Sequence, residues 1–155
     1  MSQQPPGTPR PSTAPPGLIY LIKQVELAAR VRFEEILAPH GITATQYTAL
    51  SVLARNPGMT SARLARSSFV RIQSMAQTMS ALEALGYVSR QVDPTSRRQR
   101  TTSVTESGWA LNEKLSGPVE DLEREMLQDL DPQEAAIFGE ALRKARAALG
   151  GSHAV

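Results

Sequence analysis

The spacing of apolar residues changes from helical to strand-like at one place in the middle of this 155-residue chain. Up to Leu85 they recur at steps of three and four, the period of an amphipathic helix. After Gly86, residues 87–92 and 100–104 alternate and are rich in β-branched side chains, which predicts two short strands. Residues 93–99 between them predict a turn with a basic tip. The pattern therefore indicates a mainly α fold with one small β-hairpin.

Turn and capping residues divide the region before the hairpin into four predicted helices. The first begins at Leu18 and is stopped by the proline and glycine of residues 39–41. The second begins at Thr43, where T-x-x-Q predicts a capping box, and ends before the Asn-Pro-Gly turn at 56–58. A short third helix, capped by a hydroxyl at residue 60 or 61, is broken by two serines at 67–68, and a fourth covers residues 70–85.

The two faces of the helix over residues 70–85 differ in chemistry. At 100° per residue, one face is apolar and is expected to be buried: Ile72, Met75, Met79 and Leu82. The opposite face holds small and amide side chains: Gln73, Ser74, Gln77, Ser80, Ala81 and Ala84. Small residues let a helix approach DNA base edges, and glutamine can pair bidentately with adenine. An ordinary solvated face usually mixes glutamate and lysine, so this face is predicted to enter a DNA groove.

Charge is segregated along the chain. Residues 55–104 carry eight arginines and two acidic residues, a net charge of +6, whereas residues 105–140 carry two basic and ten acidic residues, a net charge of −8. A basic middle region is typical of a surface that contacts phosphates. Together with helix, short helix, helix and basic hairpin within about sixty residues, it predicts a winged helix-turn-helix over residues 43–104.

The two ends of the chain differ from its middle. Residues 1–17 contain six prolines and no acidic or aromatic residue, which predicts a disordered arm, and residues 151–155 are expected to be a disordered tail. Residues 18–42 and 105–150 carry wide apolar helical stripes, with Pro118 expected to kink or split the helix that begins after Thr105. Since a winged domain offers too little surface to cover these stripes, they are expected to be dimerisation helices.

Composition excludes several classes of protein. The chain has no cysteine and two histidines, so disulfides, thiol catalysis, a thiol redox switch and histidine- or cysteine-rich metal sites are not expected. It has no apolar run long enough to cross a membrane and no secretory signal pattern, which predicts a cytoplasmic protein. No acid/base pair, nucleophile motif or phosphate-binding glycine loop stands out, so we expect neither an enzyme nor a bound cofactor.

Three stretches resemble the MarR family of bacterial transcriptional regulators. They are LEALGYVSR at 82–90, DPTSRR at 93–98 and VTESG at 104–108, and their order, spacing and flanking helices match over about 130 residues. The resemblance implies a homodimer that binds double-stranded DNA at an inverted repeat. It also implies a small aromatic or anionic effector, bound between the dimerisation helices and the winged domain. Two departures are Ser96, where the family usually has an aspartate, and Ala76-Gln77 in place of a common Thr-Arg pair.

The candidate DNA contacts fall into three sets. Arg98 matches the family's wing arginine, and Gln73, Ser74 and Gln77 fall where the family reads the major groove. The full candidate sets are Arg71, Gln73, Ser74 and Gln77 for the major groove; Arg97, Arg98 and Arg100 for the wing, minor groove and phosphates; and Thr60, Ser61 and Ser68 for phosphates.

Other interpretations remain open at this point. Tyr20, Tyr47 and Trp109 could line an effector pocket, although buried structural aromatics are the expected assignment, and His40 is expected to be a surface or capping residue. The alternative function is a winged-helix adaptor that binds proteins without specific DNA binding. An adaptor has no need of an arginine-rich hairpin beside an acid-free helix face, which favours the DNA-binding regulator.

Overall fold

A computed structural model describes residues 15–68, 70–93 and 96–149 of the chain. Most of the predicted arm and the whole of the predicted tail lie outside these residues. The element order is α1 (Leu18–Leu37), the 3-10 turn η1 (Ala38–His40), α2 (Ala44–Arg55), α3 (Ser61–Ser67), α4 (Ile72–Ala84), β1 (Val88–Asp93), β2 (Ser96–Val104), α5 (Glu106–Met126) and α6 (Pro132–Ala148). The predicted mainly α fold with one hairpin is confirmed.

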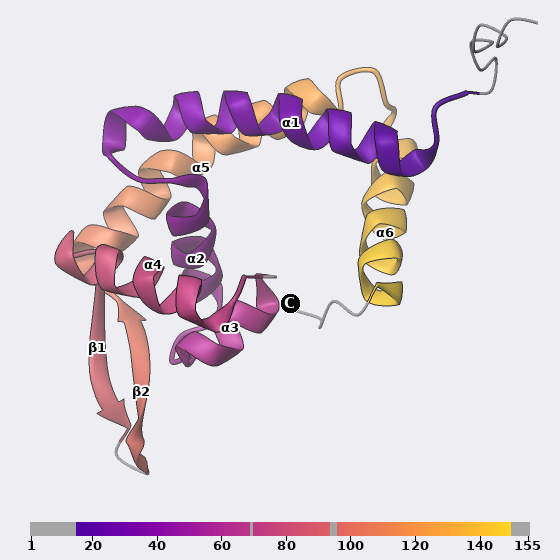
Figure 1. Cartoon of the computed structure of the whole chain (residues 1–155). Helices are drawn as coiled ribbons and strands as arrows, with labels where there is room; N and C mark the ends of the chain where they lie inside the picture. The colour runs from indigo at the N-terminus through magenta and orange to yellow at the C-terminus, as the bar shows by residue number, and fades with distance from the viewer. Residues whose placement is uncertain (1–14, 69, 94–95, 150–155) are drawn as a thin grey trace, which may run out of the picture.

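The helices form two groups (Figure 1). The long helices α1 and α5 pack along each other, and α2, α3, α4 and the hairpin form a compact unit beside them. The last helix, α6, stands away from this unit and contains no buried residue. A winged helix-turn-helix is thus joined to long helices that one chain leaves partly uncovered.

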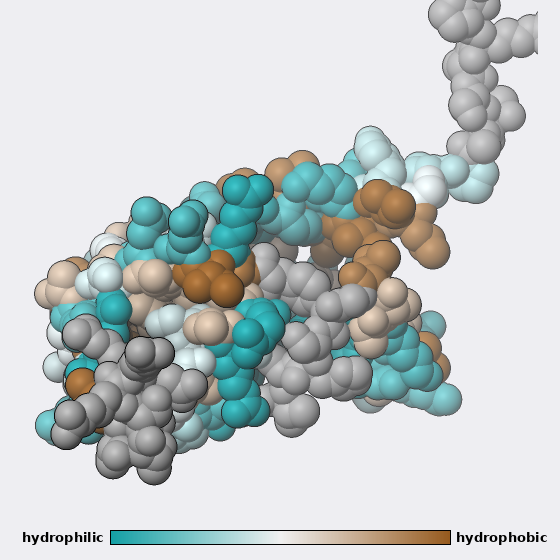
Figure 2. Space-filling view, turned by 60° about the horizontal axis from the view of Figure 1, so that its bottom comes forward, coloured by the Kyte–Doolittle hydropathy of each residue, from teal (hydrophilic) through white to brown (hydrophobic). Residues whose placement is uncertain are grey.

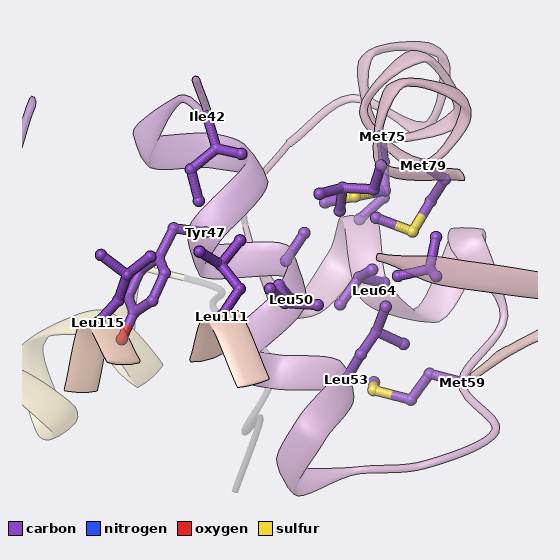
Figure 3. Packing of buried hydrophobic residues seen from close by; sticks show 14 of the residues in the cluster. Ile42, Tyr47, Leu50, Leu53, Met59, Leu64, Met75, Met79, Leu111 and Leu115 are labelled. Atoms are coloured by element: carbon purple, nitrogen blue, oxygen red, sulfur yellow. The ribbon is translucent and has the colours of Figure 1, made fainter. Parts of the chain in front are cut away.

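One hydrophobic core joins the helix-turn-helix to α5 (Figure 3). Its fully buried side chains come from α1, α2, α3, α4 and α5: Leu37, Leu50, Leu53, Leu64, Met75, Met79, Leu82 and Leu115. The predicted stripe of α4 is confirmed for Met75, Met79 and Leu82 but is wrong for Ile72, which is 57% exposed. A helical side chain leans toward the preceding turn, and Ile72 is the first residue of α4, so no turn precedes it to cover it.

Local capping follows the sequence closely. Thr43 and Gln46 form the predicted capping box at the start of α2, with the backbone N–H of Gln46 donating to Thr43 Oγ1 at 3.2 Å. Asp131 and Glu134 form a second capping box at the start of α6. Of the predicted kink or split at Pro118, the split is wrong, because α5 runs without a break from Glu106 to Met126, and the kink stays a prediction. Proline removes a single backbone donor, which a 21-residue helix packed against α1 tolerates.

The hairpin is longer than its sequence predicts. β1 and β2 are antiparallel, with Val88 opposite Val104 and Asp93 opposite Ser96. The predicted turn over residues 93–99 is therefore too long, because β2 begins at Ser96. Ladder hydrogen bonds join backbone groups whatever the side chains, so polar and arginine residues can extend a strand once its partner is in place. Thr102 N–H also donates to the Met59 carbonyl oxygen at 3.3 Å, which fixes the hairpin to the segment before α3.

The hairpin returns to α5 through a compact junction. Gly86 has a φ of 79°, the left-handed conformation that ends α4 and turns the chain into β1. Thr105 donates its hydroxyl to the Gly86 carbonyl oxygen at 2.6 Å, and its Oγ1 accepts from the Gly108 N–H at 3.1 Å. A Cβ at Gly108 would collide with the Tyr87 carbonyl oxygen. These contacts hold α4, the hairpin and α5 in a fixed relation.

Candidate nucleic-acid interface

The outward face of α4 is polar, small and free of acidic groups. Met75 and Met79 anchor α4 in the core, and the residues on its opposite side, Gln73, Gln77, Ser80 and Ala84, are exposed. Ser74 is also exposed, on the flank that faces α2. The structure thus brings the three predicted groove-reading residues of α4 to the surface of the helix-turn-helix. The one carboxylate of α4, that of Glu83, lies toward the hairpin.

A shallow hollow of about 420 Å³ separates α4 from the start of α2. Its polar lining is made of hydroxyl and amide side chains: Thr43, Thr45, Gln46, Ser74, Gln77 and Thr78. None of these side chains carries a charge, so the groups beside the exposed face of α4 donate and accept hydrogen bonds without repelling phosphates.

Arg90 of β1 connects the hairpin to α4. Its side chain is 15% exposed, its Nη2 donates to Ser80 Oγ at 2.7 Å, and its Nε lies 3.1 Å from a Glu83 carboxylate oxygen. In the sequence, Arg90 belongs to the basic region and ends the LEALGYVSR stretch, and no contact was predicted for it. The signal was available, because strand alternation places Arg90 on the same face as the buried Val88, where a charged group needs a partner.

Arginines of the helix-turn-helix differ from those of the long helices. Arg55, Arg63, Arg66 and Arg71 are exposed, and none makes an ion pair with another residue that the structure describes. In the long helices, Arg30 pairs with Glu26, Arg32 with Glu125, Arg124 with Asp121 and Arg143 with Glu140. Unneutralised positive charge is thus concentrated on the helix-turn-helix.

The remaining predicted DNA contacts lie at helix starts, in the hairpin and in one unexpected place. Thr60 is the N-cap of α3, accepting from the Arg63 N–H at 3.3 Å, Ser61 is its first residue, and Arg71 is the N-cap of α4. The backbone of Arg97, Arg98 and Arg100 lies in β2, and their side chains lie outside the described part of the structure. Ser68 lines a cavity instead, and its Oγ is buried without a hydrogen-bond partner among the described residues.

That cavity, of about 900 Å³, lies between α1, α2 and α5 and is called the α1–α5 cavity below. Its apolar lining includes Val25, Ala29, Phe33, Val119, Leu122 and Met126. Arg32 and Glu125 join α1 to α5 at its edge, with two N–O distances of 2.9 and 3.0 Å. The hydrogen bonds from Arg32 to Glu125 raise the pKa of Arg32, and those from Lys23 and Arg30 lower the pKa of Glu26.

None of the three candidate aromatic residues lines the α1–α5 cavity. Tyr47 is a buried structural residue, as predicted, and packs edge-on against Phe33 with ring centroids 5.5 Å apart. The expectation of burial is wrong for Tyr20 and Trp109, which are 56% and 47% exposed. Both lie on long helices that the rest of this single chain covers only in part. His40 is the last residue of the 3-10 turn after α1 and is half-buried, and the C-cap of that turn is Gly41.

Large apolar side chains remain exposed on the long helices. They include Leu18, Ile19, Ile22 and Val31 of α1, and Ile137 and Leu142 of α6. Figure 2 shows brown surface gathered at the end of the molecule where α1 begins. Exposed apolar area of this extent marks a surface that binds another molecule.

Two further properties of the described residues bear on function. No helix among them is both long and apolar enough to cross a membrane. Within the same part of the chain, histidine, aspartate and glutamate side chains form no group of three or more that could hold a metal ion.

Comparison with known proteins places the chain in a family. Residues 40–99 match a sequence model of the MarR family. The HTH-type transcriptional repressor Rv2887 of Mycobacterium tuberculosis is 30% identical over 125 residues, which cover 81% of this chain and 90% of the relative. The chain belongs to the MarR family. The MarR-family assignment confirms the resemblance stated from the sequence, and the winged helix-turn-helix is that of a transcriptional regulator.

Solved structures agree with this MarR-family assignment. The reduced form of MarR from E. coli is 26% identical, with a TM-score of 0.74 over 86% of this chain and 98% of that one. BpsR of Bordetella bronchiseptica, whose DNA binding is regulated by 6-hydroxynicotinic acid, has a TM-score of 0.75 over 83% of this chain and 97% of its own. At 20% identity, BpsR supports the fold alone. The relatives are named as transcriptional regulators rather than enzymes.

Proposed function

We propose that this MarR-family chain is a homodimeric repressor that reads an inverted-repeat DNA operator and is released by a small molecule. The observation that carries the proposal is the exposed face of α4, which holds Gln73, Ser74 and Gln77 and no acidic side chain. This face has the size and hydrogen-bonding groups needed to read base edges in a major groove. Glu83, at its edge, is paired with Arg90, so its charge opposes DNA less.

The phosphate contacts are proposed to surround this face. Arg63, Arg66 and Arg71, which make no ion pair within the described part of the chain, lie on α3 and at the start of α4. The α3 start also carries the hydroxyls of Thr60 and Ser61. Arginine and hydroxyl groups of this kind fix the position of a protein on DNA without reading sequence. Arg97, Arg98 and Arg100 of β2 are proposed to follow the neighbouring minor groove. Ser68 is left out of this set because its hydroxyl is buried.

Dimer formation is supported by the uncovered long helices. α6 has no buried residue, and Ile137 and Ile19 are 60% and 86% exposed. A second copy of the chain would cover these side chains through a two-fold interface. The same symmetry would place two α4 helices about 34 Å apart, as successive major grooves of an inverted repeat require.

Release by an effector is supported by the position of the α1–α5 cavity. Its walls come from α1 and α5, which carry the proposed dimer surface, and from Ser68 and Val70 in the connection between α3 and α4. A ligand that favours one arrangement of these elements would change the spacing of the two α4 helices. Such coupling is reciprocal, so operator DNA would weaken ligand binding by the same factor. A repressor of this kind would work in the cytoplasm, where its DNA is.

Selection of bound sequences from a random double-stranded DNA library, at near-physiological salt, tests this proposal. The expected result is an enriched inverted repeat whose half-sites lie about one helical turn apart. A variant that carries both Gln73→Ala and Gln77→Ala, selected in parallel, should enrich a less defined repeat. Weak, salt-sensitive binding without any enriched sequence would contradict the proposal and favour the adaptor alternative.

A further inference from the structure

Some charged side chains of the α1–α5 cavity form ion pairs within the described structure, and others do not. Its lining contains two arginines, Arg30 and Arg32, and four carboxylates, Glu26, Glu34, Glu123 and Glu125, a net charge of −2. Both guanidinium groups already face a carboxylate: Arg30 Nε lies 2.7 Å from Glu26, and Arg32 holds Glu125 through two hydrogen bonds. An anionic ligand would therefore share each guanidinium with a carboxylate that already compensates its charge.

Two of the carboxylates have no such partner. Glu34 of α1 and Glu123 of α5 make no side-chain hydrogen bond or ion pair with any residue that the structure describes. Their exposed charges therefore leave the cavity with a negative potential. A cation in the cavity would gain from both charges without displacing an existing pair.

A third polar group points to a hydrogen-bonding ligand. Ser68 lines the cavity, and its hydroxyl oxygen is buried with no hydrogen-bond partner among the residues that the structure describes. A buried hydroxyl without a hydrogen bond is unfavourable, so a ligand donor placed there would gain a bond at little cost. An ammonium group donates three hydrogen bonds, and both a hydroxyl oxygen and carboxylates accept them.

The start of α2 also attracts anions at the cavity, since a helix N-terminus carries partial positive charge. Its capping box already supplies oxygen acceptors to two of the amides there, those of Thr43 and Gln46. Its attraction for an anion is weakened accordingly, and two full negative charges on α1 and α5 outweigh what remains.

We propose that the α1–α5 cavity takes a hydrophobic amine, with an apolar ring system against Phe33, Leu122 and Met126 and a protonated amino group toward Glu34, Glu123 and Ser68. This inference rests on the proposed effector-released repressor and names the chemical class of its effector. It differs from the aromatic or anionic effector that the sequence resemblance implies, because the anion-binding arginines of this chain are already paired.

Three indole compounds of similar size test the charge preference: tryptamine, indole-3-ethanol and indole-3-acetate. Binding to the full-length protein is measured by calorimetry and by the shift in melting temperature. Tryptamine is expected to bind most tightly, and its affinity is expected to fall as salt rises, because salt screens ion pairs that water reaches. Tighter or equal binding of indole-3-acetate overturns the proposal, and so does a failure of tryptamine to bind at millimolar concentration.

Matched variants locate the charge. Glu123→Gln should weaken tryptamine binding about three- to fivefold, the range of a solvent-exposed ion pair, and should leave indole-3-ethanol unchanged. Glu120→Gln, on α5 outside the cavity lining, should leave tryptamine binding unchanged. Equal effects of the two substitutions would overturn the assignment of Glu123.

Release of the selected operator separates this inference from the proposed function. If the operator is released by indole-3-acetate and not by tryptamine, the repressor stands and the amine effector is wrong. If no operator is selected but tryptamine binds with the expected dependence on Glu123, the cavity assignment stands and the repressor is wrong.

Discussion

Arg90 of β1 lies 3.1 Å from the carboxylate of Glu83 on α4, and this pair joins the hairpin to the proposed recognition helix. The same guanidinium donates to Ser80 on the outward side of α4. One residue therefore fixes the hairpin relative to α4 and compensates the single acidic side chain of that helix.

The first prediction concerns this pair. Arg90→Ala should lower affinity for operator DNA by about 1–2 kcal/mol, because it removes a hydrogen bond of a charged group and leaves Glu83 uncompensated near phosphates. Adding Glu83→Gln should recover part of the loss, whereas Glu83→Gln alone should not weaken binding. Fluorescence anisotropy of labelled operator DNA, with the unsubstituted protein, the two single variants and the double variant, gives the coupling energy between Arg90 and Glu83. If the double variant binds as weakly as Arg90→Ala, compensation of Glu83 is not the role of Arg90.

The second prediction concerns base reading by α4. Gln77→Ala should cost about 1–3 kcal/mol at the selected operator and relax the preference at one base pair, since glutamine reads an adenine edge directly. Binding to random DNA should not change. Gln133→Ala, at the exposed start of α6, is the matched control and should have no effect. Equal losses on operator and random DNA would contradict direct reading.

The third prediction separates unpaired from paired arginines. Arg63→Ala and Arg66→Ala should weaken binding to every sequence and reduce the slope of log K against log salt by about 0.9 for each phosphate that the arginine had neutralised. Arg143→Ala, whose guanidinium pairs with Glu140, should change neither quantity. Measuring the DNA affinity of Arg98→Ala over the same range of salt tests the hairpin. An unchanged affinity would mean that Arg98 does not contact DNA.

The fourth prediction tests the dimer. Ile137→Glu places a charge on an exposed apolar position of α6 and should dissociate the dimer at micromolar concentration, since burying an unpaired carboxylate is unfavourable. Gln91→Glu adds the same charge at an exposed position of β1 and should leave the dimer intact. Sedimentation velocity measures both. A stable, well-folded monomer of the unsubstituted chain would contradict the dimer outright.

The fifth prediction concerns a buried hydroxyl. Thr102 is 1% exposed, and its Oγ1 has no hydrogen-bond partner in the described structure. Thr102→Val should raise the free energy of unfolding by about 1 kcal/mol, because valine has the same shape without a desolvated hydroxyl. Thr101→Val, at the neighbouring half-buried position, should have a smaller effect. Urea unfolding at equal protein concentration measures the free energy of unfolding of each variant. A less stable Thr102→Val protein would mean that the Thr102 hydroxyl does make a hydrogen bond.

Local features were predictable because the groups that form them are close in sequence. The capping boxes at Thr43 and Asp131 join residues three apart, and Gly86 ends α4 through its own backbone conformation. The apolar period likewise placed Met75, Met79 and Leu82 on one face. The exposed polar face of α4 followed directly, because each side chain on a helix has a fixed direction.

Features that depend on which elements meet were missed. The sequence predicts a kink or split at Pro118 and burial of Trp109. In the structure α5 is continuous from Glu106 to Met126, and the described part of the chain leaves Trp109 47% exposed. Ser68 was assigned to the phosphate contacts with Thr60 and Ser61, whereas its hydroxyl is buried and Ser68 lines the α1–α5 cavity. Neither the path of α5 nor its neighbours can be derived from a helical period alone.

The sequence by itself determined the helices, the hairpin, the acid-free face of α4 and the basic middle region, because periodicity, capping and charge act over a few residues. Only the tertiary structure decided which charges remain available. It pairs Arg90 with Glu83 and Arg32 with Glu125, and within the described residues it leaves Arg63 and Glu123 without ion-pair partners. Ion pairs between distant residues depend on distances of a few ångströms, which are set by how whole helices pack.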